Sequence, residues 1–158
     1  MNEAASVFSG MTPAQILEAA RSLMAGERNF TANCANLAAL IFHALPGLNW
    51  AGFYFRDGDS LVLGPFQGKP ACVRIPAGQG VCGAAASQKK TQMVADVHAF
   101  PGHIACDPAS RAEIVIPLLR GDHLLGVLDL DSPAAGRFTQ ADRELLEALT
   151  SLLVTVSD

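Results

Sequence analysis

Hydrophobic residues recur at helical spacing at both ends of the chain and at strand spacing between them, and this order most limits the possible folds. A cap at Thr12 followed by Pro13 begins the first helix, and Gly26 ends it. The second helix covers 31–45, and the third begins at a cap on Thr139 and carries leucines at helical spacing. The chain therefore begins and ends with helices that have an apolar face.

The middle of the chain is typical of an antiparallel sheet. Asp57-Gly58 is a hairpin turn signal, a short Ala-rich helix is expected over 81–88, and 96–111 is polar and irregular. Strands are predicted over 50–55, 61–66, 71–76, 91–94, 113–119 and 124–131. We expect an α+β domain, with a central antiparallel sheet of about six strands and the N-terminal and C-terminal helices packed on one face.

Length and composition favour one globular domain. The 158 residues are 50% hydrophobic and 16% charged, and the net charge of −4 does not favour nucleic acid or an anionic membrane as a partner. The longest apolar runs, such as 37–45, are much shorter than the roughly 20 residues of a membrane-spanning helix. Residues 1–10 lack the basic region of a signal peptide. We expect a cytoplasmic protein whose single domain covers 1–158, with 1–11 as a flexible N-terminal segment.

Four cysteines, Cys34, Cys72, Cys82 and Cys106, follow one another at intervals of 38, 10 and 24 residues. None of these intervals is the short C-x-x-C spacing of zinc or thioredoxin-like sites. The four histidines do not supply the three or four converging ligands of a metal site, and we expect no metal and no cofactor. Cysteines with no such role are usually buried small hydrophobes.

Three of the cysteines have surroundings that favour reactivity. Cys106 lies in the irregular segment between His103 and Asp107, where a thiolate can be stabilised. Cys82 follows glycines at the expected start of the short helix, whose dipole favours a thiolate. Cys72 lies after Lys69 and before Arg74, whose positive charges favour its thiolate in the same way. Three such cysteines within 35 residues indicate redox chemistry.

Carboxylates form a second candidate cluster. Asp129 and Asp131 share one face of an otherwise apolar strand, where their repulsion would raise the pKa of one of them. Glu113 begins the facing strand. A two-residue turn at Gly121-Asp122 would pair Glu113 with Leu130, on the wrong face, so we expect an odd-length connection or a β-bulge that pairs it with an aspartate.

Trp50 and Tyr54 are the only Trp and Tyr, and they lie on one face of the first strand. They are either core residues or an aromatic wall for an apolar substrate segment.

These features occur within blocks that resemble the free methionine-R-sulfoxide reductase family, whose members have the GAF fold. The resemblance covers about 49–139 and includes all three reactive cysteines, which generic GAF domains lack. The blocks are Asn49-Trp-Ala-Gly-Phe-Tyr, Gly64-Pro-Phe-Gln-Gly-Lys-Pro-Ala-Cys-Val-Arg-Ile, Gly80-Val-Cys-Gly, Asp96-Val-His, Gly102-His-Ile-Ala-Cys-Asp and Gly126-Val-Leu-Asp-Leu-Asp-Ser.

The resemblance implies a role for each candidate residue. Cys106 is the catalytic nucleophile, Cys72 is the resolving cysteine, and Cys82 is a third cysteine that can also form a disulfide. Cys34 matches nothing in the family pattern. The resemblance assigns the substrate pocket to Trp50, Tyr54, Glu113, Asp129 and Asp131.

The implied reaction reduces free L-methionine-(R)-S-oxide to L-methionine through a sulfenic acid and an intramolecular disulfide, which thioredoxin or a similar dithiol recycles. We expect a homodimer that forms through the first and last helices. Two alternatives remain at this point: a non-catalytic GAF module that binds or senses a small molecule, and a thiol redox sensor.

Overall fold

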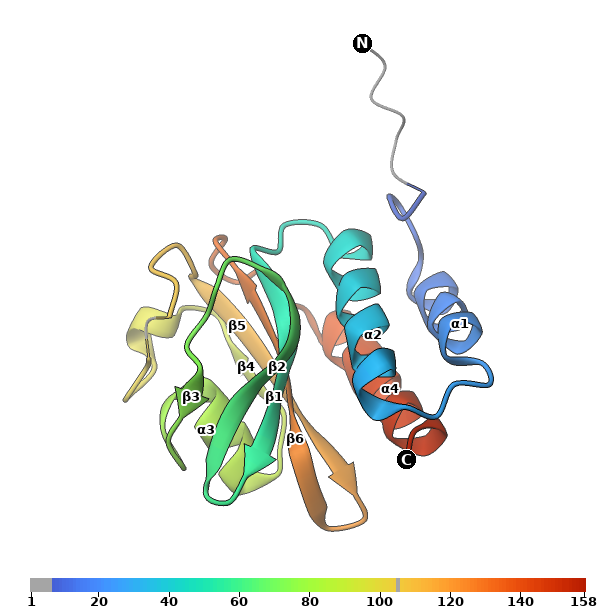
Figure 1. Cartoon of the computed structure of the whole chain (residues 1–158). Helices are drawn as coiled ribbons and strands as arrows, with labels where there is room; N and C mark the ends of the chain where they lie inside the picture. The colour runs from blue at the N-terminus through green and yellow to red at the C-terminus, as the bar shows by residue number, and fades with distance from the viewer. Residues whose placement is uncertain (1–6, 105) are drawn as a thin grey trace.

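The computed structural model describes residues 7–104 and 106–158, and its centre is one twisted sheet (Figure 1). Six antiparallel strands lie in the order β3-β2-β1-β6-β5-β4. Their bounds are β1 Trp50–Asp57, β2 Ser60–Gly68, β3 Arg74–Ile75, β4 Gln92–Val94, β5 Ala112–Arg120 and β6 His123–Ser132. The predicted α+β class and the six-stranded antiparallel sheet are confirmed.

Helices α2 (Phe30–Ala44) and α4 (Gln140–Val156) cover one face of the sheet, and α1 (Pro13–Met24) packs outside them (Figure 1). The apolar stripes of all three helices and the inward residues of β1, β5 and β6 form the larger hydrophobic core. Leu128 and Leu130 point into this core, so the aspartates that alternate with them point to the opposite face. The alternation on β6 thus separates the packed face from the polar one.

Both predicted helix caps are present. The Thr12 hydroxyl accepts from the backbone N–H of Gln15 at 3.2 Å, and the Gln15 side chain accepts from the backbone N–H of Thr12 at 2.8 Å. Thr139 and Asp142 make the same reciprocal pair at the start of α4. Each capping box satisfies two backbone donors that a helix start would otherwise leave unpaired.

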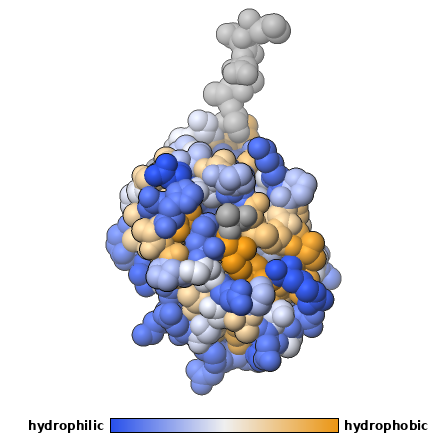
Figure 2. All heavy atoms as spheres, turned by 90° about the vertical axis from the view of Figure 1, so that its left-hand side faces the viewer, coloured by the Kyte–Doolittle hydropathy of each residue, from blue (hydrophilic) through white to orange (hydrophobic). Residues whose placement is uncertain are grey.

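The second face of the sheet is covered by α3 (Gly80–Gln88) and by the segment that contains the short 3₁₀ helix Val97–Ala99. A smaller core lies here, between the aromatic residues of β1 and the apolar side of α3. Figure 2 looks onto this side of the molecule and shows hydrophobic surface in the middle, with hydrophilic residues around it. A pocket on this face lies between the sheet, the start of α3 and the segment around Ile104.

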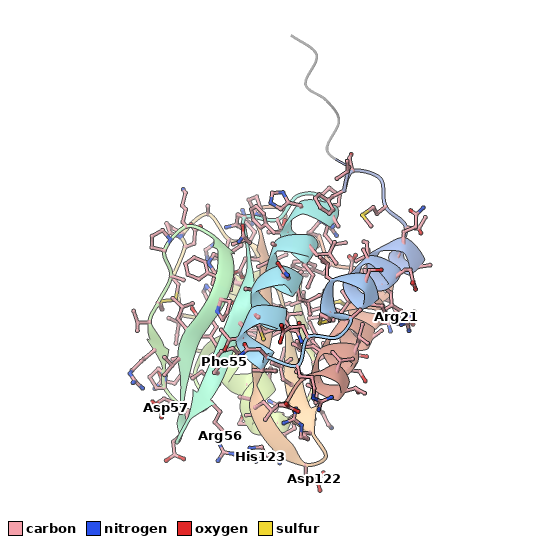
Figure 3. The ribbon with its side chains drawn as sticks, turned by 45° about the vertical axis from the view of Figure 1, so that its right-hand side comes forward. Arg21, Phe55, Arg56, Asp57, Asp122 and His123 are labelled. Atoms are coloured by element: carbon pink, nitrogen blue, oxygen red, sulfur yellow. A yellow bond between two sulfur atoms is a disulfide. The ribbon has the colours of Figure 1, made fainter. Side chains whose placement is uncertain are left out.

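The β5–β6 hairpin contains the predicted β-bulge. Its turn has two residues, because Arg120 pairs with His123. The turns of the β1–β2 and β5–β6 hairpins lie at the same end of the sheet (Figure 3). Between Leu118 and Leu119 the register shifts by one residue, so that Glu113 pairs with Asp131 instead of Leu130. The shift brings Glu113 onto the face of the two aspartates.

The N-terminal region and the third strand differ from the expectation in detail. The ring centroids of Phe8 and His43 are 6.0 Å apart, so the chain already contacts the helical layer before α1 begins. Residues 1–6 of the expected flexible segment lie outside the described residues. The strand predicted over 71–76 is shorter, because only Arg74 and Ile75 pair with β2. No helix in the described part of the chain has the length and apolarity to cross a membrane.

Candidate active site

All the predicted site residues except Cys72 line one pocket on the second face of the sheet, and Cys72 is bonded to one of them, Cys106. The pairing of β1, β6 and β5 aligns Trp50, Asp131 and Glu113 in one row across the three strands. Asp129 lies in the next row, opposite Gly52 on β1, and Tyr54 lies one row further. All five predicted substrate residues line the same pocket, and Cys82 and Cys106 line it as well. Sheet register brings together residues that are far apart in the sequence.

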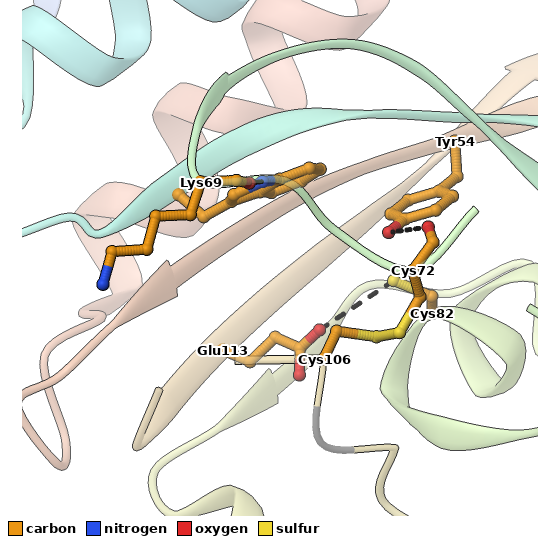
Figure 4. Close-up of a disulfide and its surroundings, with 7 residues drawn as sticks. Tyr54, Lys69, Cys72, Cys82, Cys106 and Glu113 are labelled. Atoms are coloured by element: carbon orange, nitrogen blue, oxygen red, sulfur yellow. Dashed lines mark hydrogen bonds between the residues drawn. A yellow bond between two sulfur atoms is a disulfide. The ribbon is translucent and has the colours of Figure 1, made fainter. Parts of the chain in front are cut away.

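A disulfide between Cys72 and Cys106 closes one side of this pocket (Figure 4). Their Cα atoms are 5.5 Å apart, within the range of ordinary disulfides. Cys34 and Cys82 are free and buried. The pair that the family resemblance implies is therefore the one that is bonded, and the protein is in its oxidised state.

The two aromatic residues also line the pocket, and they hold the segment that leads to Cys72. The rings of Trp50 and Tyr54 are stacked with centroids 5.8 Å apart, and Phe66 stacks on Trp50 at 5.3 Å. The Trp50 indole N–H donates to the Lys69 carbonyl at 3.1 Å, and the Tyr54 hydroxyl donates to the Cys72 carbonyl at 2.9 Å (Figure 4). Buried Trp and Tyr need such partners for their polar groups.

Glycine at position 52 makes room for this stack. A Cβ on Gly52 would lie 2.7 Å from Cη2 of Trp50 and 2.3 Å from Cβ of Phe66. Both distances are shorter than van der Waals contact, so only glycine fits beneath the indole. Gly52 and Phe66 therefore shape the site, although sequence reasoning singled out neither of them. The signal for Gly52 was a glycine in the middle of an otherwise bulky strand.

Burial raises the pKa of all three pocket carboxyl groups, Glu113, Asp129 and Asp131. Neighbouring negative charges raise the pKa of the two aspartates further: Asp131 and Glu113 act on Asp129, and Glu113 and Asp107 act on Asp131. The expected mutual repulsion is present, but burial is the larger cause. A carboxyl group with a raised pKa can keep a proton near neutral pH and donate it.

The prediction for Cys82 is wrong in one respect. Cys82 lies inside the first turn of α3 and is only 4% exposed, and its thiol donates to Glu113 Oε1 at 3.9 Å. Burial, together with the negative charges of Asp129 and Glu113, raises the pKa of this thiol well above its usual range. The helix dipole does not produce a thiolate here, because desolvation and three nearby carboxyl groups oppose it.

The positive charges expected to activate Cys72 lie elsewhere. The Arg74 guanidinium forms an ion pair with Asp57 at 3.0 Å on the surface. The Lys69 ammonium points away from the disulfide (Figure 4). These two side chains therefore do not lie where their charges would stabilise a Cys72 thiolate.

A polar anchor that sequence reasoning missed holds the Cys106 segment against the sheet. The Asn49 side-chain amide donates to Asp107 Oδ2 at 3.1 Å and to Ser110 Oγ at 3.0 Å. The Asn49 backbone N–H donates to the carbonyl of Asp131 at 3.0 Å. Asn49 thus joins the residue after Cys106 to the strand that carries the aspartates, and the signal for it was its place at the start of the family block that contains Trp50.

The fold and pocket place this protein in a known class. A sequence model of the GAF domain matches residues 15–155, which is nearly the whole chain. The protein is thus a GAF-domain protein, and the disulfide and carboxyl groups in its pocket point to a redox enzyme within that class.

Comparisons with individual proteins narrow the class further. The free methionine-R-sulfoxide reductase of Escherichia coli is 54% identical over 135 residues, which cover 85% of this chain and 82% of that protein. A crystal structure from Burkholderia vietnamiensis, named as a candidate GAF sensor protein, is 58% identical over 92% of both chains, with a TM-score of 0.88. The free methionine-R-sulfoxide reductase of Neisseria meningitidis, solved with its substrate, is 41% identical over 99% of this chain and 91% of that one, with a TM-score of 0.87. The chain belongs to the free methionine-R-sulfoxide reductase family.

Proposed function

We propose that this protein reduces free L-methionine-(R)-S-oxide to L-methionine, with Cys106 as nucleophile and Cys72 as resolving cysteine. The observation that carries the proposal is the Cys72–Cys106 disulfide beside a pocket lined by buried carboxyl groups. The related enzymes named for this reaction, in Escherichia coli and Neisseria meningitidis, support the choice of substrate and epimer.

The chemistry proceeds in two steps. The Cys106 thiolate attacks the sulfoxide sulfur while a carboxyl group protonates the sulfoxide oxygen, and methionine leaves with Cys106 oxidised to a sulfenic acid. The Cys72 thiolate then attacks the Cys106 sulfur, the disulfide forms, and the sulfenic hydroxyl takes up a proton from solvent and leaves as water. The two electrons that reduce the sulfoxide come from the two cysteine sulfurs.

The carboxyl groups have two tasks in this scheme. One donates the proton to the sulfoxide oxygen, which the raised pKa values of Glu113, Asp129 and Asp131 favour. Another, in its ionised form, accepts the ammonium group of the free amino acid. The Trp50 and Tyr54 rings contact the apolar part of the substrate.

The partners of the reaction follow from its products. The disulfide must be reduced by an external dithiol for the next cycle, and thioredoxin is the proposed reductant. Such recycling requires a reducing compartment, which is consistent with a cytoplasmic location. We also propose a homodimer through α1 and α4, which lie on the side of the sheet opposite the pocket, so that dimerisation leaves the reductant free access.

The deciding experiment measures methionine released from free methionine sulfoxide with thioredoxin, thioredoxin reductase and NADPH. The R epimer of the free amino acid should be reduced, whereas the S epimer and a peptide-bound methionine sulfoxide should not. Equal rates with both epimers would contradict the proposal. Binding of the R epimer without any methionine release would support the GAF sensor, the class in which the Burkholderia protein is named.

A further inference from the structure

Three buried side chains from different elements converge at the bottom of the pocket. Cys82 of α3, Glu113 of β5 and Asp129 of β6 bring one potential ligand atom each to within 4.8 Å of one another. The Cys82 sulfur is 3.9 Å from Glu113 Oε1. In a tetrahedral zinc site the bonds are about 2.0–2.3 Å long, so neighbouring ligand atoms lie about 3.3–3.8 Å apart. Small side-chain adjustments bring these three atoms to that spacing.

The same cluster contains an acceptor without a donor. Asp129 is only 5% exposed, and its Oδ1 is fully buried and has no hydrogen-bond partner among the described residues. The described ion pairs all involve other acids, so neither a lysine nor an arginine of residues 7–104 and 106–158 neutralises Glu113 or Asp129. The ionised form of a buried carboxyl group is costly without a cation, so a cation at this position would stabilise the ionised form of Asp129.

We propose that this cluster binds a thiophilic divalent cation, Zn²⁺, through the Cys82 sulfur and the Glu113 and Asp129 carboxylates. Mg²⁺ and Ca²⁺ prefer six or more oxygen ligands, whereas one sulfur and two oxygens suit zinc. On binding, Cys82 releases its thiol proton to solvent, and so does each of Glu113 and Asp129 that still holds a proton. The three ligands then carry a charge of −3, which the ion reduces to −1, and the fourth coordination position opens into the pocket.

Zinc at this site inhibits the enzyme, because the ion occupies two of the carboxylates that the substrate needs. This consequence rests on the proposed reductase function, whereas the binding itself does not. Reduction of sulfoxide and zinc binding are therefore mutually exclusive, and the protein is active only where free zinc is scarce.

The oxidised protein allows a direct test, since its disulfide leaves Cys34 and Cys82 as the free thiols. Cd²⁺ serves as a probe because cadmium–thiolate bonds absorb in the ultraviolet. We expect one Cd²⁺ per chain, with an absorption that Zn²⁺ displaces. Cys82→Ser should abolish the absorption, and Cys34→Ser, the matched control in the other hydrophobic core, should retain it. Asp129→Asn should weaken binding at least tenfold while circular dichroism shows an unchanged fold.

Several outcomes overturn the site: no absorption, an absorption that survives Cys82→Ser, or one that is lost in Cys34→Ser. A separate measurement follows methionine released in one turnover by the reduced protein, with and without one equivalent of Zn²⁺, where a loss of at least tenfold is expected. Unchanged release with Zn²⁺ bound contradicts the inhibition. A protein that binds Cd²⁺ as expected but never releases methionine contradicts the reductase function and leaves the metal site standing.

Discussion

The Tyr54 hydroxyl donates a 2.9 Å hydrogen bond to the backbone carbonyl of Cys72. Tyr54 lies on β1 in the middle of the sheet, whereas Cys72 lies in the irregular segment between β2 and β3. Burial, followed by the charge of Asp129, raises the pKa of Tyr54, so the hydroxyl remains a donor at any pH at which the enzyme works. The bond therefore ties the substrate pocket to Cys72, the cysteine to which the proposed function gives the resolving role.

Tyr54→Phe should separate the two chemical steps. The ring remains and still stacks on Trp50, but the Cys72 segment loses its anchor. Because one hydrogen bond contributes about 1–1.5 kcal/mol, we expect disulfide formation to slow about fivefold to tenfold. Methionine release in the first turnover should be unchanged. Rapid-quench trapping of the Cys106 sulfenic acid with dimedone measures the difference. A sulfenic acid lifetime equal to that of the wild type would show that the bond has no such role.

Cys106→Ser should abolish methionine release, because the serine hydroxyl cannot form the sulfenic acid. The variant should still fold. Cys34→Ser is the matched control and should retain full turnover, since Cys34 lies in the helical core away from the pocket. The thioredoxin-coupled assay measures both. Activity of more than a few per cent in Cys106→Ser would end its assignment as the nucleophile.

The pocket carboxyl groups should make the protein less stable as the pH rises. A carboxyl group with a raised pKa in the folded state contributes stability that is fully present below the unfolded pKa of about 4 and is lost towards the folded pKa. Within that pH range, each such group lowers the free energy of unfolding by up to about 1.4 kcal/mol for each pH unit. Asp129→Asn should therefore show a smaller fall in melting temperature between pH 5 and pH 8.

The exposed turn residue Asp122 provides the control for this experiment, because Asp122→Asn removes a carboxylate outside the pocket. It should leave the pH dependence of the melting temperature as in the wild type. If Asp129→Asn and Asp122→Asn give the same pH dependence, the pocket carboxyl groups are not the cause.

Cys34 should resist alkylation in the native protein. Burial raises the pKa of its thiol to about 12, so almost no thiolate is present at pH 8. Iodoacetamide labelling followed by peptide mapping should show that Cys34 is modified only after unfolding. Peptide mapping of the oxidised protein should show Cys72 joined to Cys106. A disulfide to Cys34 as the main oxidation product would contradict the scheme.

Gly52→Ala should disturb the aromatic wall, since the added methyl group would overlap with Trp50 and Phe66. We expect the free energy of unfolding to fall by about 1–3 kcal/mol, as at other overpacked sites. We also expect the Trp50 fluorescence maximum to shift, to the blue or to the red, because the indole ring is displaced. Chemical denaturation measures the first effect. A variant as stable as the wild type with unchanged fluorescence would show that the strands can separate to accept the methyl group.

Much of the fold could be predicted from local signals. The capping boxes at Thr12 and Thr139, the helical stripes and the Asp57-Gly58 turn depend on residues a few positions apart, so they can be recognised without knowledge of the fold. The alternation of Leu128 and Leu130 with the two aspartates predicted which side chains share a face. The roles of the three cysteines came from the family blocks that surround them.

Only the tertiary structure decided how these parts meet. The bulge between Leu118 and Leu119 determines that Glu113 faces Asp131, and its position depends on packing along the whole hairpin. The pKa of the Cys82 thiol depends on its desolvation by strands that are far away in the sequence. This desolvation outweighs the effect of the local helix dipole, on which the sequence-based expectation depended. Local patterns thus determined the elements, whereas the pocket's chemistry depends on contacts between distant residues, which no local pattern contains.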